Sequence, residues 1–97
     1  MARQIAWTLS AIEDRFHIYR FWETNNDSNR YSEKLEKLFN GAANLIAEFP
    51  GIGTKTNKEG VRVKIVKEFI LFYTFNDSEI KILRVWDSRH NPTKLRL

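Results

Sequence analysis

Strict alternation of apolar and polar residues opens the chain and predicts a β-strand. Between residues 3 and 9, the apolar side chains of Ile5, Trp7 and Leu9 fall on one side, and polar or small ones fall on the other. A period of two matches strand geometry, in which successive side chains point to opposite faces. We therefore expect a short strand here, with one face buried.

The period then changes to that of a helix over residues 11–23. Ser10 and Glu13 have the spacing of a capping box, in which each side chain accepts a hydrogen bond from the other residue's backbone N–H. Phe21 falls among polar residues, so we expect it to be an exposed aromatic. At about 100° per residue, one wide arc is predicted to face the core: Ala11, Ile12, Arg15, Phe16, Ile18, Tyr19 and Trp22.

A second, longer helix is predicted to begin at Asp27 or Ser28, either of which can cap it, and to end before Pro50. Because only a short polar segment separates the two helices, we expect them to pack antiparallel as a hairpin. The residues of this helix that are expected to face the core lie in a narrow arc: Tyr31, Leu35, Leu38, Ala42, Leu45 and Phe49, flanked by Phe39 and Ile46.

Three strand-like segments follow a polar, glycine-bearing loop over residues 51–60. Residues 61–65 and 79–86 are predicted to form strands, and residues 69–75 are apolar on both faces, which is typical of a central strand. The turn between the first two strands is Lys67–Glu68. The expected fold is therefore α+β in the order β-α-α-β-β-β. An antiparallel helical hairpin packs on a mostly antiparallel, twisted sheet.

Composition places the chain among single globular domains. Its 97 residues suffice for one core, so we expect one domain over residues 1–97. The absence of cysteine excludes disulfides and thiolate sites and fits a reducing compartment, the cytoplasm. Residues 51–97 hold ten basic and five acidic residues, whereas residues 1–50 hold six and seven. This excess positive charge predicts either a surface that meets an acidic partner, nucleic acid or protein, or a solvated basic face.

Few residues suggest catalysis. The two histidines are far apart and have no carboxylates at ligand spacing, so we expect no metal and no cofactor. Metal-free phosphodiester cleavage stays open, because it needs cations beside the phosphate and a group that exchanges protons near neutral pH. His90 is the candidate for proton transfer, unless it only caps a turn of the tail. The candidate cations, which hairpin geometry can gather on one edge, are Arg62, Lys64, Lys67 and Arg89.

The order of these features resembles that of the toxins in the RelE/ParE superfamily, one half of bacterial type II toxin–antitoxin modules. The likeness extends over nearly the whole chain and implies the same β-α-α-β-β-β fold. It is carried by the early strand ending at Trp7, the helix start Ser10–Asp14, the helix end Phe49–Pro50 with Gly53 after it, the strand Phe69–Tyr73 and the segment Ile80–Pro92.

Two activities occur in this superfamily: RelE-like and YoeB-like members cut mRNA on the ribosome, and ParE-like members block DNA gyrase. The ribonucleases usually carry an arginine at the second position of the aromatic-rich strand, where this chain has Ile70. The resemblance therefore implies a plasmid-stabilisation toxin that arrests growth by ParE-like inhibition of gyrase. The alternative is ribosome-dependent cleavage of mRNA by a metal-independent endoribonuclease. A third reading is a non-toxic basic module that binds a partner or nucleic acid.

The resemblance also implies two partners: a cognate antitoxin, which we expect to be acidic, and a target, either gyrase or the ribosome with its mRNA. We predict that the target contacts Arg62, Lys64, Lys67, Arg84, Trp86 and Arg89. If the chain is a ribonuclease, the expected catalytic residues are His90, Arg89, Lys67, Arg62 and Lys64. We predict that the antitoxin contacts Phe21, Trp22, Ile82 and Arg84.

Overall fold

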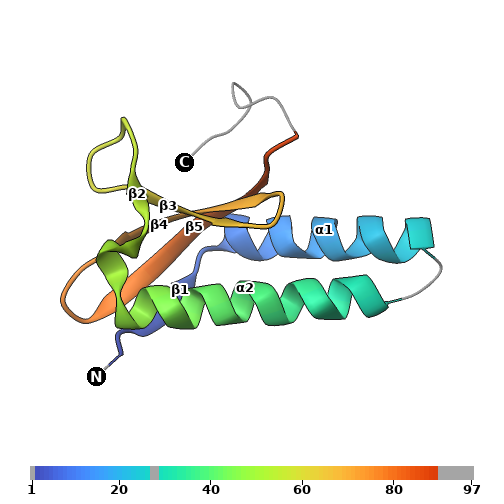
Figure 1. The fold of residues 1–97 in the computed structure, drawn as a ribbon, viewed down its shortest axis with the longest axis horizontal. Helices are drawn as coiled ribbons and strands as arrows, with labels where there is room; N and C mark the ends of the chain where they lie inside the picture. The colour runs from blue at the N-terminus through green and yellow to red at the C-terminus, as the bar shows by residue number, and fades with distance from the viewer. Residues whose placement is uncertain (1, 27–28, 90–97) are drawn as a thin grey trace.

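The computed structural model describes residues 2–26 and 29–89, in which two helices lie side by side against a five-stranded sheet (Figure 1). The elements are β1 (Gln4–Trp7), α1 (Leu9–Asn26), α2 (Arg30–Glu48), η1 (Pro50–Ile52), β2 (Thr54–Lys55), β3 (Arg62–Val66), β4 (Phe69–Phe75) and β5 (Glu79–Asp87). This confirms the predicted fold, to which the structure adds the 3-10 turn η1 and the short strand β2 inside the expected loop. Within the described residues, no helix is both long and apolar enough to cross a membrane.

The sheet has the strand order β1-β5-β4-β3-β2. β1 pairs with β5 in parallel, and all other neighbouring strands are antiparallel. β4 lies in the middle, as its apolar residues on both faces predicted. Because β1 pairs only with residues 79–82 of β5, the second half of β5 is not covered by a strand on that side, and α1 lies there instead.

Helix α1 begins earlier than predicted, and Thr8 rather than Ser10 caps it. The Thr8 hydroxyl accepts a hydrogen bond from the Ala11 N–H over 3.1 Å and donates one to the Leu83 carbonyl of β5 over 2.8 Å. The predicted capping box is therefore wrong, because a residue already anchored to the sheet caps the helix first. Leu9, expected on the buried face of the strand, is the first helical residue and is 71% exposed.

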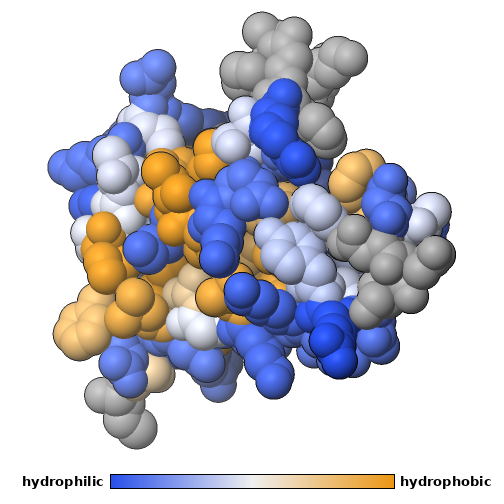
Figure 2. Space-filling model, turned by 45° about the vertical axis from the view of Figure 1, so that its right-hand side comes forward, coloured by the Kyte–Doolittle hydropathy of each residue, from blue (hydrophilic) through white to orange (hydrophobic). Residues whose placement is uncertain are grey.

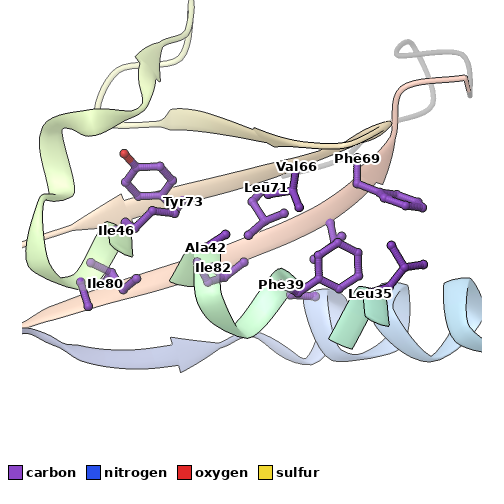
Figure 3. Packing of buried hydrophobic residues seen from close by; sticks show 13 residues of the cluster. Leu35, Phe39, Ala42, Ile46, Val66, Phe69, Leu71, Tyr73, Ile80 and Ile82 are labelled. Carbon is purple, nitrogen blue, oxygen red and sulfur yellow. The ribbon is translucent and has the colours of Figure 1, made fainter. Parts of the chain in front are cut away.

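The hydrophobic core lies between α2 and the helix-facing side of the sheet, where side chains from the two layers point toward one another (Figure 3). The rings of Phe39 and Phe69 meet edge to face across this boundary, with their centres 5.4 Å apart. The largest fully buried side chains are Leu35, Phe39, Ile46, Phe69, Leu71, Tyr73, Ile80 and Ile82.

The buried face of α2 is rotated from the predicted arc toward α1. Phe39 and Ile46, expected only to flank the arc, are fully buried, whereas Leu45 and Phe49 are exposed. The rotation arises because α2 packs against both the sheet and α1, so its buried direction lies between these two neighbours.

Helix α1 buries less of its predicted arc. Ala11 is fully buried, and Ile18 and Trp22 pack against the core while remaining partly accessible. Ile12 and Phe16 were expected to face the core, but both are exposed. The reason is the position of α1 beside the edge of β5, where only a narrow line of the helix reaches the core.

The loop after α2 is fastened to the sheet through Tyr73. Its hydroxyl donates to the Pro50 carbonyl over 2.7 Å and accepts from the Gly53 N–H over 2.9 Å. Arg62 donates to the Gly53 carbonyl, also over 2.7 Å. Burial raises the pKa of the Tyr73 hydroxyl. A Cβ on Gly53 would lie 2.5 Å from this hydroxyl and 2.6 Å from the Val63 carbonyl oxygen, so only glycine fits without movement of its neighbours.

Candidate functional site

The free edge of β5 is completed by a side chain from α1 rather than by another strand. The Asp14 carboxylate accepts a hydrogen bond from the Val85 N–H over 3.0 Å. The same carboxylate forms a bidentate ion pair with Arg84, at 2.7 and 3.0 Å. Hydrogen bonding to Asp14 raises the pKa of the Arg84 guanidinium. Asp14 therefore fixes α1 and β5 against each other.

Two adjoining hollows form a groove between α1 and the end of β5, which we call the α1–β5 groove. Their open volumes are about 510 and 320 Å³, and both are lined by His17, Ile18 and Asp87. The other lining residues are Asp14, Phe21, Trp22, Phe69, Val85, Trp86 and Arg89.

Arg89 is held in a fixed position at one end of this groove. Its Nε and Nη2 donate to the Asp87 carboxylate over 2.9 and 2.6 Å, and its guanidinium lies 5.9 Å from the centre of the Trp22 ring. Hydrogen bonding to Asp87 raises the pKa of Arg89. Asp87 is buried, whereas the Arg89 side chain is 53% exposed. A guanidinium held along one edge keeps further N–H donors for a partner.

Aromatic rings of α1 line the groove, and Tyr31 of α2 packs against them. The Phe21 ring lies 5.4 Å from that of Trp22, which lies 4.5 Å from Tyr31, and both contacts are edge to face. Phe21 is 51% exposed, which confirms the expectation of an exposed aromatic. Trp, Tyr and Arg side chains in partly enclosed pockets are the residues that most often dominate binding energy at protein interfaces.

The groove brings together residues that the sequence had assigned to two different partners. Phe21 and Trp22 are predicted antitoxin contacts, and Trp86 and Arg89 are predicted target contacts, yet all four line this one surface. Arg84, predicted for both partners, lies beside it, with its guanidinium 5.6 Å from the centre of the Trp86 ring.

The remaining predicted cations do not line the groove. Arg62 and Lys64 project from one side of β3, as expected from their alternate positions. Lys67 occupies the β3–β4 turn with a φ of 57°. The Ser88 N–H donates to the Glu68 carbonyl, so this turn lies at the end of the sheet where β5 finishes. Arg62 instead bonds to the loop after α2. The β3–β4 turn that holds Lys67 and the segment that holds Arg89 thus lie at the same end of the sheet, whereas Arg62 lies at the other end of β3.

Ile82 is a predicted antitoxin contact that the structure contradicts. It is fully buried in the core, on the side of β5 that faces the helices. Its apolar character therefore reflects core packing, and a partner of the folded chain does not reach it. His90, the predicted acid or base, lies outside the described residues.

Sequence reasoning missed three groups that shape the groove. Asp14 and Asp87 hold the two arginines, and His17 lines both hollows. A signal for the helical part exists, because Asp14, His17, Ile18 and Phe21 recur at spacings that share one face of a helix. The role of Asp87 depends on how the end of β5 meets α1, which local spacing does not reveal.

The chemistry of the groove suits binding. It combines aromatic surface with Arg89, whose charge is balanced by Asp87, and the Asp14–Arg84 ion pair lies beside it. In residues 2–26 and 29–89, no cluster of three or more His, Asp or Glu side chains is arranged to hold a metal ion.

Comparison with known proteins agrees with the resemblance inferred from the sequence. A family model described as the ParE toxin of the type II toxin–antitoxin system parDE matches residues 5–92. A solved structure, the chromosomal ParDE toxin–antitoxin system from P. aeruginosa, shares the fold with a TM-score of 0.74 and 20% identity, over 87% of this chain and 94% of that chain. No curated protein matches the sequence. Since the family match covers nearly all of the described fold, the chain belongs to the ParE toxin family of type II toxin–antitoxin systems.

Proposed function

We propose that this chain arrests bacterial growth by binding DNA gyrase, with the α1–β5 groove as the contact surface. Membership of the ParE toxin family supports the role of toxin. The groove supports a binding mechanism, because its exposed Phe21, its tryptophans and its fixed Arg89 guanidinium are groups that anchor protein interfaces.

The observation that carries this proposal is the pairing of the site's arginines. Arg84 is paired with Asp14, and Arg89 with Asp87. Phosphodiester cleavage requires cations aimed at the negative charge that develops on the phosphate. A carboxylate beside each cation repels that charge and weakens its stabilisation. Arginines that are already paired with carboxylates are better suited to contacting a protein surface than to stabilising a phosphate.

Ile70 supports the same conclusion. It stands where ribonuclease members of the superfamily usually carry an arginine. In the sheet it lies between Ile65 and Trp86, on the face away from the helices. The row formed by Ile65, Ile70 and Trp86 is apolar, so it offers no charge to a phosphate. Such a row favours contact with another protein.

We also propose that an acidic antitoxin neutralises the chain. The similar solved structure is described as a toxin–antitoxin system, and the second half of this chain has an excess of basic residues. Opposite charge speeds the association of two proteins, and burial of apolar surface slows their dissociation.

Induced expression in bacteria, with three readouts, tests the proposed function. We expect growth arrest together with a DNA-damage response and intact mRNA, because blocked gyrase damages DNA. Arg89→Glu should relieve the arrest by reversing a charge in the groove. Its matched control, Arg20→Glu, changes an exposed residue of α1 that does not line the groove, and should leave the arrest intact.

Two outcomes would contradict the proposal. Cleaved mRNA that disappears in the His90→Gln variant would identify the chain as an mRNA endoribonuclease. Normal growth, with folded protein present, would identify it as a non-toxic binding module.

A further inference from the structure

A further hollow, which we call the β2–β3 hollow, lies between the loop that joins β2 to β3 and the last residue of β4. Its open volume is about 700 Å³. Phe75, at its base, pairs with Ile80 near the start of β5, whereas the α1–β5 groove lies at the end of β5. The two surfaces are therefore at opposite ends of the sheet. The residues that line this hollow are Lys55, Thr56, Lys58, Glu59, Gly60, Val61, Arg62 and Phe75.

The sheet places two cations and an aromatic ring of this hollow on one face. Lys55 of β2 pairs directly with Arg62 of β3, which pairs with Tyr73 of β4. Side chains of directly paired residues lie on the same face of an antiparallel sheet. Phe75 follows Tyr73 by two residues, so it shares that face as well. All of them therefore lie on the helix-facing side, where Tyr73 is buried in the core.

The loop that carries the third cation, Lys58, is held in shape by its own hydrogen bonds. The Thr56 N–H donates to the Val61 carbonyl, and the Val61 N–H donates to the Lys58 carbonyl, both over 3.1 Å. The Thr56 hydroxyl accepts from the Lys58 N–H over 3.2 Å. Gly60 has a φ of 80°, which glycine adopts without strain. The loop, which projects from the sheet in Figure 1, is therefore a built wall of the hollow.

The positive charge of the hollow is not balanced by ion pairs. Arg62 donates to two backbone carbonyls of the segment after α2, over 2.7 and 3.3 Å, and these acceptors are neutral. Neither Lys55 nor Lys58 forms an ion pair with a described residue. The lining has three cations, and Glu59 is its one carboxylate. This distinguishes the hollow from the two arginine–aspartate pairs at the other end of the sheet.

Cations without acidic partners are suited to phosphate groups. Lys and Arg side chains bind the nucleic-acid backbone by neutralising phosphates, which releases condensed counterions. Phe75 is 39% exposed and offers an apolar contact to a sugar. Hydrophilic side chains cover the β2–β3 loop on the face seen in Figure 2, as a phosphate site requires. Among the described residues no histidine lines the hollow, so its chemistry favours binding over cleavage.

We propose that the β2–β3 hollow binds a phosphate of the nucleic-acid backbone, and that it contacts the DNA held by gyrase while the α1–β5 groove contacts the enzyme. The identity of this DNA rests on the proposed function, whereas the phosphate site itself does not. Since phosphate contacts carry no base information, the binding is independent of DNA sequence. A second contact within one complex also strengthens attachment to the first, because it forms at high effective concentration.

Fluorescence anisotropy of a short duplex DNA, titrated with the purified chain, tests this inference without gyrase. Three phosphate contacts predict that affinity falls about 40-fold when salt is raised from about 50 to about 200 mM. Lys55→Gln and Lys58→Gln should each remove one contact, so the fall becomes about 12-fold. The matched control, Lys37→Gln, removes the same charge from an exposed position of α2 and should keep the salt dependence of the unmodified chain.

Glu59→Gln gives the test a second direction. Removing the one carboxylate of the lining should strengthen DNA binding, because it no longer repels the phosphate. Damage to the fold would weaken binding instead. Weaker or unchanged binding by folded Glu59→Gln would therefore count against the site.

Other results would also overturn the inference. One is an unchanged salt dependence in both lysine variants, and another is an equal change in Lys37→Gln, which would show a diffuse effect of net charge. Displacement of the DNA by equimolar ATP would assign the hollow to free nucleotides, and tighter binding of poly-glutamate than of DNA would assign it to an acidic protein.

Gyrase inhibition by the same proteins separates this inference from the proposed function. Inhibition by a chain that does not bind DNA would overturn the inference and leave the proposed function standing. DNA binding with the expected salt dependence, but without inhibition of gyrase, would support the phosphate site and contradict the proposed function.

Discussion

At the scale of single residues, the space beside the Tyr73 hydroxyl decides what position 53 can hold. We expect Gly53→Ala to lower the free energy of unfolding by about 1–3 kcal/mol, because the new methyl group overlaps its neighbours. The matched control is Gly41→Ala in α2, where nothing lies within 4 Å. It should raise stability by about 0.5–1 kcal/mol. Urea denaturation measures both, and equal stability of Gly53→Ala and the unmodified chain would contradict the described packing.

The Tyr73 hydroxyl also predicts a pH dependence. Burial raises its pKa, so the folded state resists ionisation more than the unfolded state does. Its contribution to stability is complete below the ordinary tyrosine pKa of about 10, and it is lost as pH rises toward the higher pKa of the folded state. We expect the stability difference between the unmodified chain and Tyr73→Phe to narrow above this pH in urea denaturation. A difference that stays constant from neutral pH to pH ~11 would argue against this linkage.

At the scale of elements, α1 takes the place of a strand along the second half of β5. Asp14 bonds both Val85 and Arg84, so Asp14→Ala leaves a backbone donor and a cation without this partner. We expect a loss of about 1–3 kcal/mol in the free energy of unfolding. Glu13→Ala, at the exposed neighbouring position, is the control and should change it little. A loss no larger than that of the control would show that Asp14 does not hold this edge.

The elements themselves could be predicted from the sequence, but their orientation could not. Periodicity identified both helices and the central strand β4, because these signals are local. Periodicity wrongly placed Leu45 and Phe16 toward the core, although both are exposed. A helical arc shows which residues share a face, but not how two helices are oriented when they pack on a sheet. The cap was missed for a similar reason, since Thr8 is anchored through β5, far away in the sequence.

The candidate site was predicted in part. Sequence patterns selected Phe21, Trp22, Trp86 and Arg89, all of which line the α1–β5 groove. They could not show that this groove is one surface, because it forms where α1 meets β5. Charge counts likewise located the basic half of the chain, but not the division of its cations between the groove, the β3–β4 turn and strand β3.

At the scale of the whole molecule, the structure is thin in one direction. The described fold measures 42 × 32 × 21 Å, and its shortest dimension fits a single layer of helices on a sheet. Such a shape leaves the two sides of the helical hairpin open. The α1–β5 groove lies at one of these sides, where α1 meets β5, and it is the surface that we propose for target binding.

Inhibition of purified gyrase is the most direct test of the central claim that the chain acts by binding this enzyme. DNA supercoiling by gyrase is measured while the concentration of the purified chain is raised. Our account predicts that supercoiling stops when the chain approaches the concentration of gyrase, that Arg89→Glu abolishes the effect, and that His90→Gln preserves it. Two results together would contradict the account. Supercoiling would be unaffected by the chain, and ribosome-bound mRNA would be cleaved when the chain is far less abundant than the ribosome.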